Sequence, residues 1–320
     1  AVNTGTLPVT ATITVVPTFT NQDVSCIGPS ETFTITVNPT GQVNDPQDQV
    51  LCNNDDAIVE FTTDNTGGTT VYDWSSDLDI GFGTSGVGNI NSTAVNTGTS
   101  PITATITVTP SFEGCIGPSE TFTITVNPTG QVNDPQDQVL CNNDTTLPVI
   151  FTTDNTGGVT TYVWTNDTPG IGLAASGDDN IDAFVAVNTG TLPVTATITV
   201  VPTFTNQDVS CIGPSETFTI TVNPTGQVND PQDQVLCNND DAIVEFTTDN
   251  TGGTTVYDWS SDLDIGFGTS GVGNINSTAV NTGTLPVTAT ITVVPTFTNQ
   301  DVSCIGPSET FTITVNPTGQ

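Results

Sequence analysis

The seven cysteines of the chain occupy two recurring sequence contexts. Three stand in the string LCNND and four in the string CIG: Cys52, Cys141 and Cys237, then Cys26, Cys115, Cys211 and Cys304. Regular cysteines in a chain of repeats are typical of disulfides formed in an oxidising, extracellular compartment. The chain has no CxxC pair and no His, so the thiols do not fit a zinc site, and a nucleophilic thiol would lack its base.

The acidic side chains are the second group that could do chemistry, because they gather in short loop strings such as NDPQD. Oxygen-only clusters in loops suit Ca²⁺, which takes six to eight oxygen ligands. The candidate ligands are Asp45, Asp48, Asp77, Asp79, Asp134, Asp137, Asp178, Asp179, Asp230, Asp233, Asp262 and Asp264. No EF-hand or RTX pattern is present. The alternative interpretation is a polyanionic surface that keeps edge strands apart.

The composition excludes several classes of function. The chain has no Lys, Arg, His or Met, and its 34 acidic residues give a net charge of −34. Nothing neutralises a nucleic-acid backbone, and an anionic membrane surface would repel the chain. Acid–base catalysis by His and Schiff-base chemistry by Lys are absent. Paired carboxylates can hydrolyse glycosides, but the Glu residues show no pairing. We therefore expect no enzyme, and no cofactor other than Ca²⁺.

Internal repetition organises the whole chain. The string NPTGQ begins at Asn38, Asn127, Asn223 and Asn316, and residues 1–42 are identical to 186–227 and to 279–320. Cutting after each Gln predicts four parts: the C-terminal half of a truncated module (1–42) and three full modules (43–131, 132–227 and 228–320). The missing front half leads us to expect that the natural polypeptide continues on the N-terminal side.

Each module is expected to be all-β. Runs such as TATITV (103–108) and TFTITV (121–126) alternate hydroxyl and apolar residues, which is typical of strands with one face in a core. Turn clusters rich in Gly, Pro, Asn and Asp separate them, so about seven strands would form an immunoglobulin-like sandwich. A YxW string in each module predicts core aromatics: Tyr72, Trp74, Tyr162, Trp164, Tyr257 and Trp259. With short linkers, the modules would form an extended beads-on-a-string filament.

Three disulfide pairings remain open on the sequence alone. We expect first a pairing within modules, because the first and last strands of such sandwiches can be parallel neighbours; it gives Cys52–Cys115, Cys141–Cys211 and Cys237–Cys304. A second pairing, across a last strand, a linker and a first strand, gives Cys26–Cys52, Cys115–Cys141 and Cys211–Cys237. A third clasps one module to the next through Cys52–Cys211 and Cys141–Cys304.

The modules resemble the PKD-like, immunoglobulin-type repeats of giant surface adhesins of Bacteroidota, among them those of gliding flavobacteria. The resemblance covers the whole chain. It rests on the QVLCNND entry, the YxW strand, the CIGPSETFTITVNP hairpin and the NP linker. It implies secretion by the type IX system, an outer-membrane anchor elsewhere in the protein and a filament propelled along the cell. PKD domains proper have WDFGDG after the strand Trp, whereas SSDLDIGFG follows Trp74, so ligand roles of that motif do not carry over.

We therefore hypothesise the repeat region of an extracellular adhesin filament that transmits force to a substratum. The expected partners are neighbouring modules of the same chain, a surface polysaccharide or substratum, and cell-surface motility and secretion machinery bound outside this stretch. Nucleic acid and direct membrane insertion are not expected. The alternative hypothesis is an array of carbohydrate- or Ca²⁺-binding modules without a role in motility.

Overall fold

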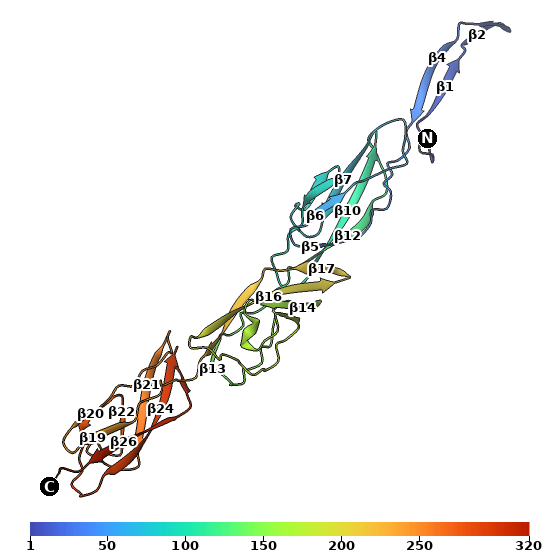
Figure 1. The fold of residues 1–320 in the computed structure, drawn as a ribbon. Helices are drawn as coiled ribbons and strands as arrows, with labels where there is room; N and C mark the ends of the chain where they lie inside the picture. The colour runs from blue at the N-terminus through green and yellow to red at the C-terminus, as the bar shows by residue number, and fades with distance from the viewer. Residues whose placement is uncertain (320) are drawn as a thin grey trace. The chain divides into compact units, whose positions relative to one another are not determined.

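The computed structural model describes residues 1–319, and the chain is all-β over them apart from the 3₁₀ turn η1 (Pro169–Ile171) (Figure 1). No helix within that stretch has the length and apolar character needed to cross a membrane. The chain divides into two compact units. Unit 1 holds 1–131, 154–160 and 202–214, and unit 2 holds 132–153, 161–201 and 215–320.

Unit 1 contains a sheet built from residues 43–131, which we call the first repeat. The strand order is β5 (Gln49–Cys52), β12 (Glu120–Asn127), β10 (Ile102–Phe112), β7 (Thr70–Ser76) and β8 (Ser85–Val87), and β11 (Cys115–Ile116) pairs with β10. Strand β5 runs parallel to β12, and the other pairs are antiparallel. A second layer consists of β6 (Asp56–Val59) paired with β9 (Ile90–Thr93). The two layers form an immunoglobulin-like sandwich.

The same order recurs in residues 132–227 and 228–320, the second and third repeats. The second repeat has β13 (Gln138–Cys141), β18 (Glu216–Asn223), β16 (Val194–Asn206), β14 (Val159–Asn166) and β15 (Ser176–Asp178), and β17 (Val209–Ile212) pairs with β16. The third has β19 (Gln234–Cys237), β26 (Glu309–Asn316), β24 (Val287–Asn299), β21 (Thr254–Ser261) and β22 (Ser270–Val272), and β25 (Val302–Ile305) pairs with β24. The chain is thus a tandem array of sandwiches.

The second layer differs between the repeats. In the third repeat β20 (Asp241–Val244) pairs with β23 (Ile275–Thr278), as β6 pairs with β9 in the first. The second repeat has isolated bridges there instead, Thr145 with Val185 and Val149 with Ile181. Its sequence reads TLPVIF where the neighbours read AIVEF, and Pro148 lacks the N–H that a regular ladder needs.

Residues 1–42 form two hairpins without a second layer. Strand β1 (Val9–Val15) pairs with β4 (Glu31–Val37), and β2 (Thr18–Asn21) pairs with β3 (Val24–Ile27). Phe33 is 51% exposed, whereas its equivalent in the first repeat, Phe122, is 3% exposed. This hairpin pair therefore lacks the apolar partners that bury the same sequence elsewhere in the chain.

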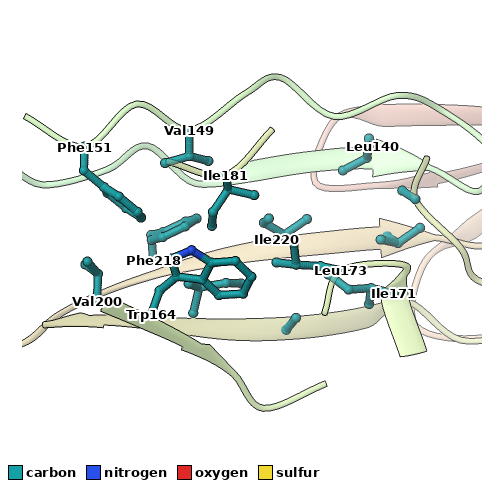
Figure 2. Packing of buried hydrophobic residues seen from close by; sticks show 14 of the residues in the cluster. Leu140, Val149, Phe151, Trp164, Ile171, Leu173, Ile181, Val200, Phe218 and Ile220 are labelled. Atoms are coloured by element: carbon teal, nitrogen blue, oxygen red, sulfur yellow. The ribbon is translucent and has the colours of Figure 1, made fainter. Parts of the chain in front are cut away.

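The alternating strands place their apolar residues in one core per repeat. Figure 2 shows Trp164 beside Phe218 and Ile220 in the second repeat, with Val149, Phe151 and Ile181 on the facing layer. All three tryptophans are buried, as are Tyr162 and Tyr257, and Tyr72 is half-buried. Burial raises the pKa of each of these tyrosines above its ordinary value. The aromatic pairs therefore pack the cores and do not form a sugar-stacking platform.

A glycine lies against each buried indole, and no side chain would fit there. A Cβ at Gly177 of β15 would overlap the ring of Trp164, and Gly86 and Gly271 stand in the same relation to Trp74 and Trp259. The short strands that carry these glycines can therefore approach β14 and its equivalents closely.

We predict that Gly177→Ala destabilises the second repeat by about 1–3 kcal/mol, because the added methyl must displace the Trp164 ring in a packed core. Gly170→Ala is the matched control, since a Cβ at that exposed glycine meets no atom within 4 Å. Calorimetry of the 320-residue chain would measure both. Equal melting temperatures for the two variants would contradict the proposed packing.

Candidate functional site

Most of the acidic residues considered as Ca²⁺ ligands bind the chain's own backbone. The carboxylates of Asp48, Asp137 and Asp233 each accept a hydrogen bond from a threonine N–H in the last long strand of the same repeat, at 2.6 Å. Those of Asp77 and Asp262 accept one from a threonine N–H of β10 and β24, at 2.7 Å. The acids thereby tie the loops to inner strands of the sheets.

Asp79 and Asp264 each organise a glycine turn. In the third repeat, Asp264 accepts hydrogen bonds from the N–H groups of Gly266 and Gly268, both at 2.9 Å, and Asp79 does the same with Gly81 and Gly83. Those bonds hold the pKa of both carboxyl groups below its ordinary value of 3.8. Both groups are solvent-exposed.

The remaining candidates do not form a cluster. Asp45, Asp134 and Asp230 lie in linker loops, and Asp178 and Asp179 lie at the end of β15. Across residues 1–319, no three His, Cys, Asp or Glu side chains come together in a way that could hold a metal ion. Ca²⁺ binding therefore stays a sequence prediction. The geometry gives the seven candidates that accept backbone hydrogen bonds a role in ordering loops and turns.

We predict that Asp264→Asn reduces the loss of stability that the third repeat shows as the pH falls into the acid range. A lowered pKa in the folded state stabilises the fold above the unfolded pKa, and this stability is lost as the pH falls through the folded pKa. Thermal melts from neutral pH to below pH ~3.8 would show it. Asp230→Asn is the control, because that carboxylate accepts no hydrogen bond within residues 1–319. If wild type and Asp264→Asn lose the same amount of melting temperature between neutral and acid pH, the stabilising role of the Asp264 carboxylate is contradicted.

The disulfides show that the within-module pairing expected from the sequence is wrong. Cys52 is bonded to Cys211 and Cys141 to Cys304, each with a Cα–Cα distance of 5.5 Å. Cys26, Cys115 and Cys237 have no disulfide partner within residues 1–319. Neither Cys52–Cys115, Cys141–Cys211 and Cys237–Cys304 nor the successive pairing Cys26–Cys52, Cys115–Cys141 and Cys211–Cys237 is formed.

The strand register explains the correction. The first and last strands are parallel neighbours, as expected, but Cys52 is paired with Asn127 at the C-terminal end of β12. Cys115 precedes the other end of β12, which spans eight residues, or roughly 26 Å at ~3.3 Å per residue. The two thiols of one repeat therefore lie at opposite ends of its sheet. The partner within reach of Cys52 belongs to the next repeat.

The cysteine of the LCNND string is held by a local turn. In the first repeat, the Asp55 carboxylate accepts a hydrogen bond from the Cys52 N–H at 2.8 Å, and Asn54 has a positive φ of 72°. Asp144 and Asp240 hold Cys141 and Cys237 in the same way. The recurrence of CNND was visible in the sequence, but the link from Asp to the cysteine backbone was not.

We call the surroundings of each disulfide the joint. In unit 1, the hairpin of β16 and β17 turns at Gln207 and Asp208, which both have positive φ, as a tight two-residue hairpin requires. The side-chain N–H₂ group of its Asn206 donates to Oδ1 of Asn127 at 2.9 Å, and that of Asn127 donates to the backbone carbonyl oxygen of Asn206 at 3.2 Å. Strand β17 lies against β5, where Cys211 meets Cys52. The hairpin of one repeat thus docks on the strand ends of the preceding one.

The linker is part of the joint. The N–H of Gly130 donates to the carbonyl oxygen of Cys211 at 3.1 Å, and a Cβ at Gly213 would collide with the carbonyl oxygen of Gly130. Beside it, the N–H of Thr156 in a loop of the second repeat donates to the carbonyl oxygen of Thr99 in the first, at 2.9 Å. The joint therefore has four attachments: the disulfide, the pair of asparagines, the linker glycine and the loop pair.

Unit 2 contains the same joint between the second and third repeats. The side-chain N–H₂ group of Asn299 donates to Oδ1 of Asn223 at 2.9 Å, and that of Asn223 donates to the backbone carbonyl oxygen of Asn299 at 3.2 Å. Gly226 donates to the carbonyl oxygen of Cys304 at 3.1 Å, and Thr251 donates to that of Thr191 at 3.0 Å. Because these distances match those in unit 1, the joint is a repeating structural element.

A buried asparagine supports each joint from within its repeat. The side-chain N–H₂ group of Asn188 donates to the carbonyl oxygens of Val222 and Leu192, both at 2.7 Å, and its backbone N–H binds the side chain of Asn142. It thereby connects the CNND turn, the NTG loop and the end of the last strand. Asn96 and Asn281 have the same bonds in the other repeats. The sequence reasoning missed these residues, although their NTG string recurs.

Comparisons with known proteins bear on the fold alone. No model of a known protein family matches the chain, and no curated protein matches it. Among solved structures, the chain is similar to the I9-I11 tandem of titin (12% identity, TM-score 0.31, 86% of this chain and 99% of that one). It is also similar to Drosophila N-cadherin EC1-4 (13%, 0.36, 96% and 83%) and to the immunoglobulin domains 1-5 of Sidekick-1 (11%, 0.31, 97% and 74%). No functional argument rests on likeness at this level.

We predict that Cys115→Ser lowers the number of free thiols in the oxidised, denatured chain by one, because Cys115 has no partner. A within-module pairing would release Cys52 instead and raise the number by one. Cys211→Ser is the control, since it removes a bonded cysteine and should raise the number by one. Thiol titration in denaturant measures all three chains, and an increase for Cys115→Ser would contradict the observed pairing.

Proposed function

We propose that the chain is a load-bearing repeat region of an extracellular adhesin filament. The observation that carries this proposal is the disulfide between successive repeats, present twice with the same geometry. Disulfides are rare in reducing compartments, which supports an extracellular location. We propose the module boundaries 43–131, 132–227 and 228–320, with residues 1–42 as the back half of a further module.

The two disulfides overlap along the chain, and this gives tension two covalent routes. From Cys52, one route crosses directly to Cys211 and follows the backbone to Cys304. The other follows the backbone to Cys141 and crosses to Cys304. Each route contains about 90 residues of backbone, against about 250 for the uncrosslinked segment. Fully stretched, the segment would therefore reach about 310 Å instead of about 860 Å at ~3.4 Å per residue.

The finer proposal is a role in gliding motility. The sequence resemblance to surface repeats of gliding Bacteroidota supports export by the type IX system, attachment to the outer membrane through another part of the protein, and transmission of motor force to a substratum. Its partners would be neighbouring modules, a surface polysaccharide or substratum, and the motility machinery. A filament that is pulled along a surface needs joints that resist extension, and the disulfide joints meet that requirement.

The alternative of a carbohydrate- or Ca²⁺-binding array has less support. The buried tryptophans offer no stacking surface, and seven of the candidate acids already accept backbone hydrogen bonds. We therefore assign the repeats a mechanical role and place adhesive contacts outside the core and the joints.

We predict that single-molecule pulling on the ends of the oxidised chain stops about 550 Å short of the reduced chain, because only about 90 residues between Cys52 and Cys304 can straighten. A Cys211→Ser/Cys304→Ser chain is the control and should extend fully without reductant. Within-module disulfides would leave only about 180 Å between Cys52 and Cys304. Equal extension of oxidised and reduced chains would contradict the load-bearing proposal.

A further inference from the structure

The third repeat carries the same strand-end surface that receives a hairpin in the two formed joints, and no hairpin of residues 1–319 docks on it. We call this surface the receptor half of a joint. Cys237 is exposed and holds the position that Cys52 and Cys141 hold in the two formed joints, paired in register with the last residue of the final strand. The Asp240 carboxylate binds the Cys237 N–H at 2.8 Å, as Asp55 does for Cys52. Its thiol is therefore placed as the bonded thiols are.

The polar groups around Cys237 also lack partners that their counterparts have. Asn127 and Asn223 are fully buried, and their side chains form hydrogen bonds with an asparagine of the next hairpin. Asn316 is half-buried, and its side chain has no hydrogen bond within residues 1–319. A Cβ at Gly130 or Gly226 would meet a proline carbonyl of the following repeat, whereas one at Gly319 would meet nothing.

The apolar rim of this receptor is uncovered as well. Val235 of β19 is 71% exposed, whereas its equivalents Val50 and Val139 are half-buried beside the docked hairpins. Leu285 is 74% exposed, and its equivalent Leu192, which contacts Gly252 of the next repeat, is 54% exposed. A thiol, an amide, a glycine and the Val235 side chain therefore stand open where the two other repeats are filled, and Leu285 is more exposed than its counterpart in the second repeat.

We propose that this end of the third repeat is a docking site for one kind of partner: a further repeat that presents the hairpin TFTNQDVSCIG. The partner cysteine would bond to Cys237, its hairpin asparagine would pair with Asn316, and its glycine would admit the carbonyl of Gly319. The inference goes beyond the mechanical role, because it rests on the continuity of the two formed joints.

The covalent step needs an oxidant. The Cys237 thiolate attacks a small disulfide such as oxidised glutathione and forms a mixed disulfide, releasing one thiol. The partner cysteine, as a thiolate, then attacks the mixed disulfide and releases a second thiol. One protein S–S bond forms, and the two protons and two electrons of the protein thiols end on the two released glutathione molecules. The docked amide and glycine contacts hold the two sulfur atoms close for the second attack.

The test extends the chain after Gln320 with a copy of residues 132–227, which reproduces the Gln–Val junction found at 227–228. The extended chain also carries Cys52→Ser and Cys211→Ser. The string CNNDDA occurs at Cys52 and Cys237, so after these substitutions it identifies Cys237 alone. The appended hairpin carries Ile→Val at the position of Ile212, so that its mass distinguishes it from the identical hairpins of the chain. Ile212 is 70% exposed, so the exchange does not alter a core. After equilibration in a glutathione buffer and alkylation, mass spectrometry identifies the partner of Cys237.

The expected result is a disulfide between Cys237 and the tagged hairpin, with an equilibrium constant within about tenfold, or ~30 mV, of that for Cys141–Cys304. An appended hairpin with Gly→Ala at the position of Gly213 is the matched variant. It should lose most of this bond, because the new methyl would strike the linker carbonyl. If the equilibrium constant of the Cys141–Cys304 disulfide changes in the same variant, the variant has a general folding defect. In that case Asn316→Ala tests the receptor instead, and it should weaken only the Cys237 disulfide.

Two outcomes would overturn the proposal. One is an alkylated, free Cys237 in an extended chain whose appended repeat melts cooperatively. The other is a Cys237 disulfide to Cys26 or Cys115 of a second chain, visible as a covalent dimer on a non-reducing gel. Either result is separate from the pulling experiment, which depends only on the two joints already formed.

Discussion

The parallel pairing of the first and last strands is the constraint on which the joints depend. Because β5 is in register with the end of β12, the cysteine that ends the first strand lies beside the last strand residue before the linker. The chain leaves the repeat at the same point, so the thiol, the linker glycine and the terminal asparagine share one surface. A shift of the register would move the cysteine away from this end and remove the disulfide with it.

A chain without cations must hold its loops by other means. No side-chain ion pair can form, because the sequence has neither Lys nor Arg nor His. The carboxylates instead accept hydrogen bonds from backbone N–H groups, which keeps their charge at the solvent surface while it orders the turns. The buried joints use neutral groups: amide pairs, glycine backbone and disulfides. Beside the joints, carboxylates such as that of Asp55 support the CNND turn.

The sequence was sufficient for the fold class and insufficient for the site. Period-two runs and one Trp in each repeat predict strands and a core, since burial of one face follows directly from the alternation. The disulfide partner of Cys52 could not be read in this way, because it depends on which end of a strand pair each cysteine occupies. The role of each Asp could not be read from the sequence for a related reason: an acid that orders a turn and an acid that binds Ca²⁺ have the same sequence neighbours. The roles of Asn127 and Gly130 became visible only once the next repeat was in place.

The overlap of the two disulfides gives the array a redundancy that other pairings lack. A break in the backbone between Cys52 and Cys141 leaves the route through Cys52–Cys211, and a break between Cys211 and Cys304 leaves the route through Cys141–Cys304. A break between Cys141 and Cys211 leaves both routes. With disulfides confined to single modules, one cut in a linker would separate the chain, because each linker would be a single covalent strand. In the clasped arrangement, a second covalent route bridges each linker between these repeats.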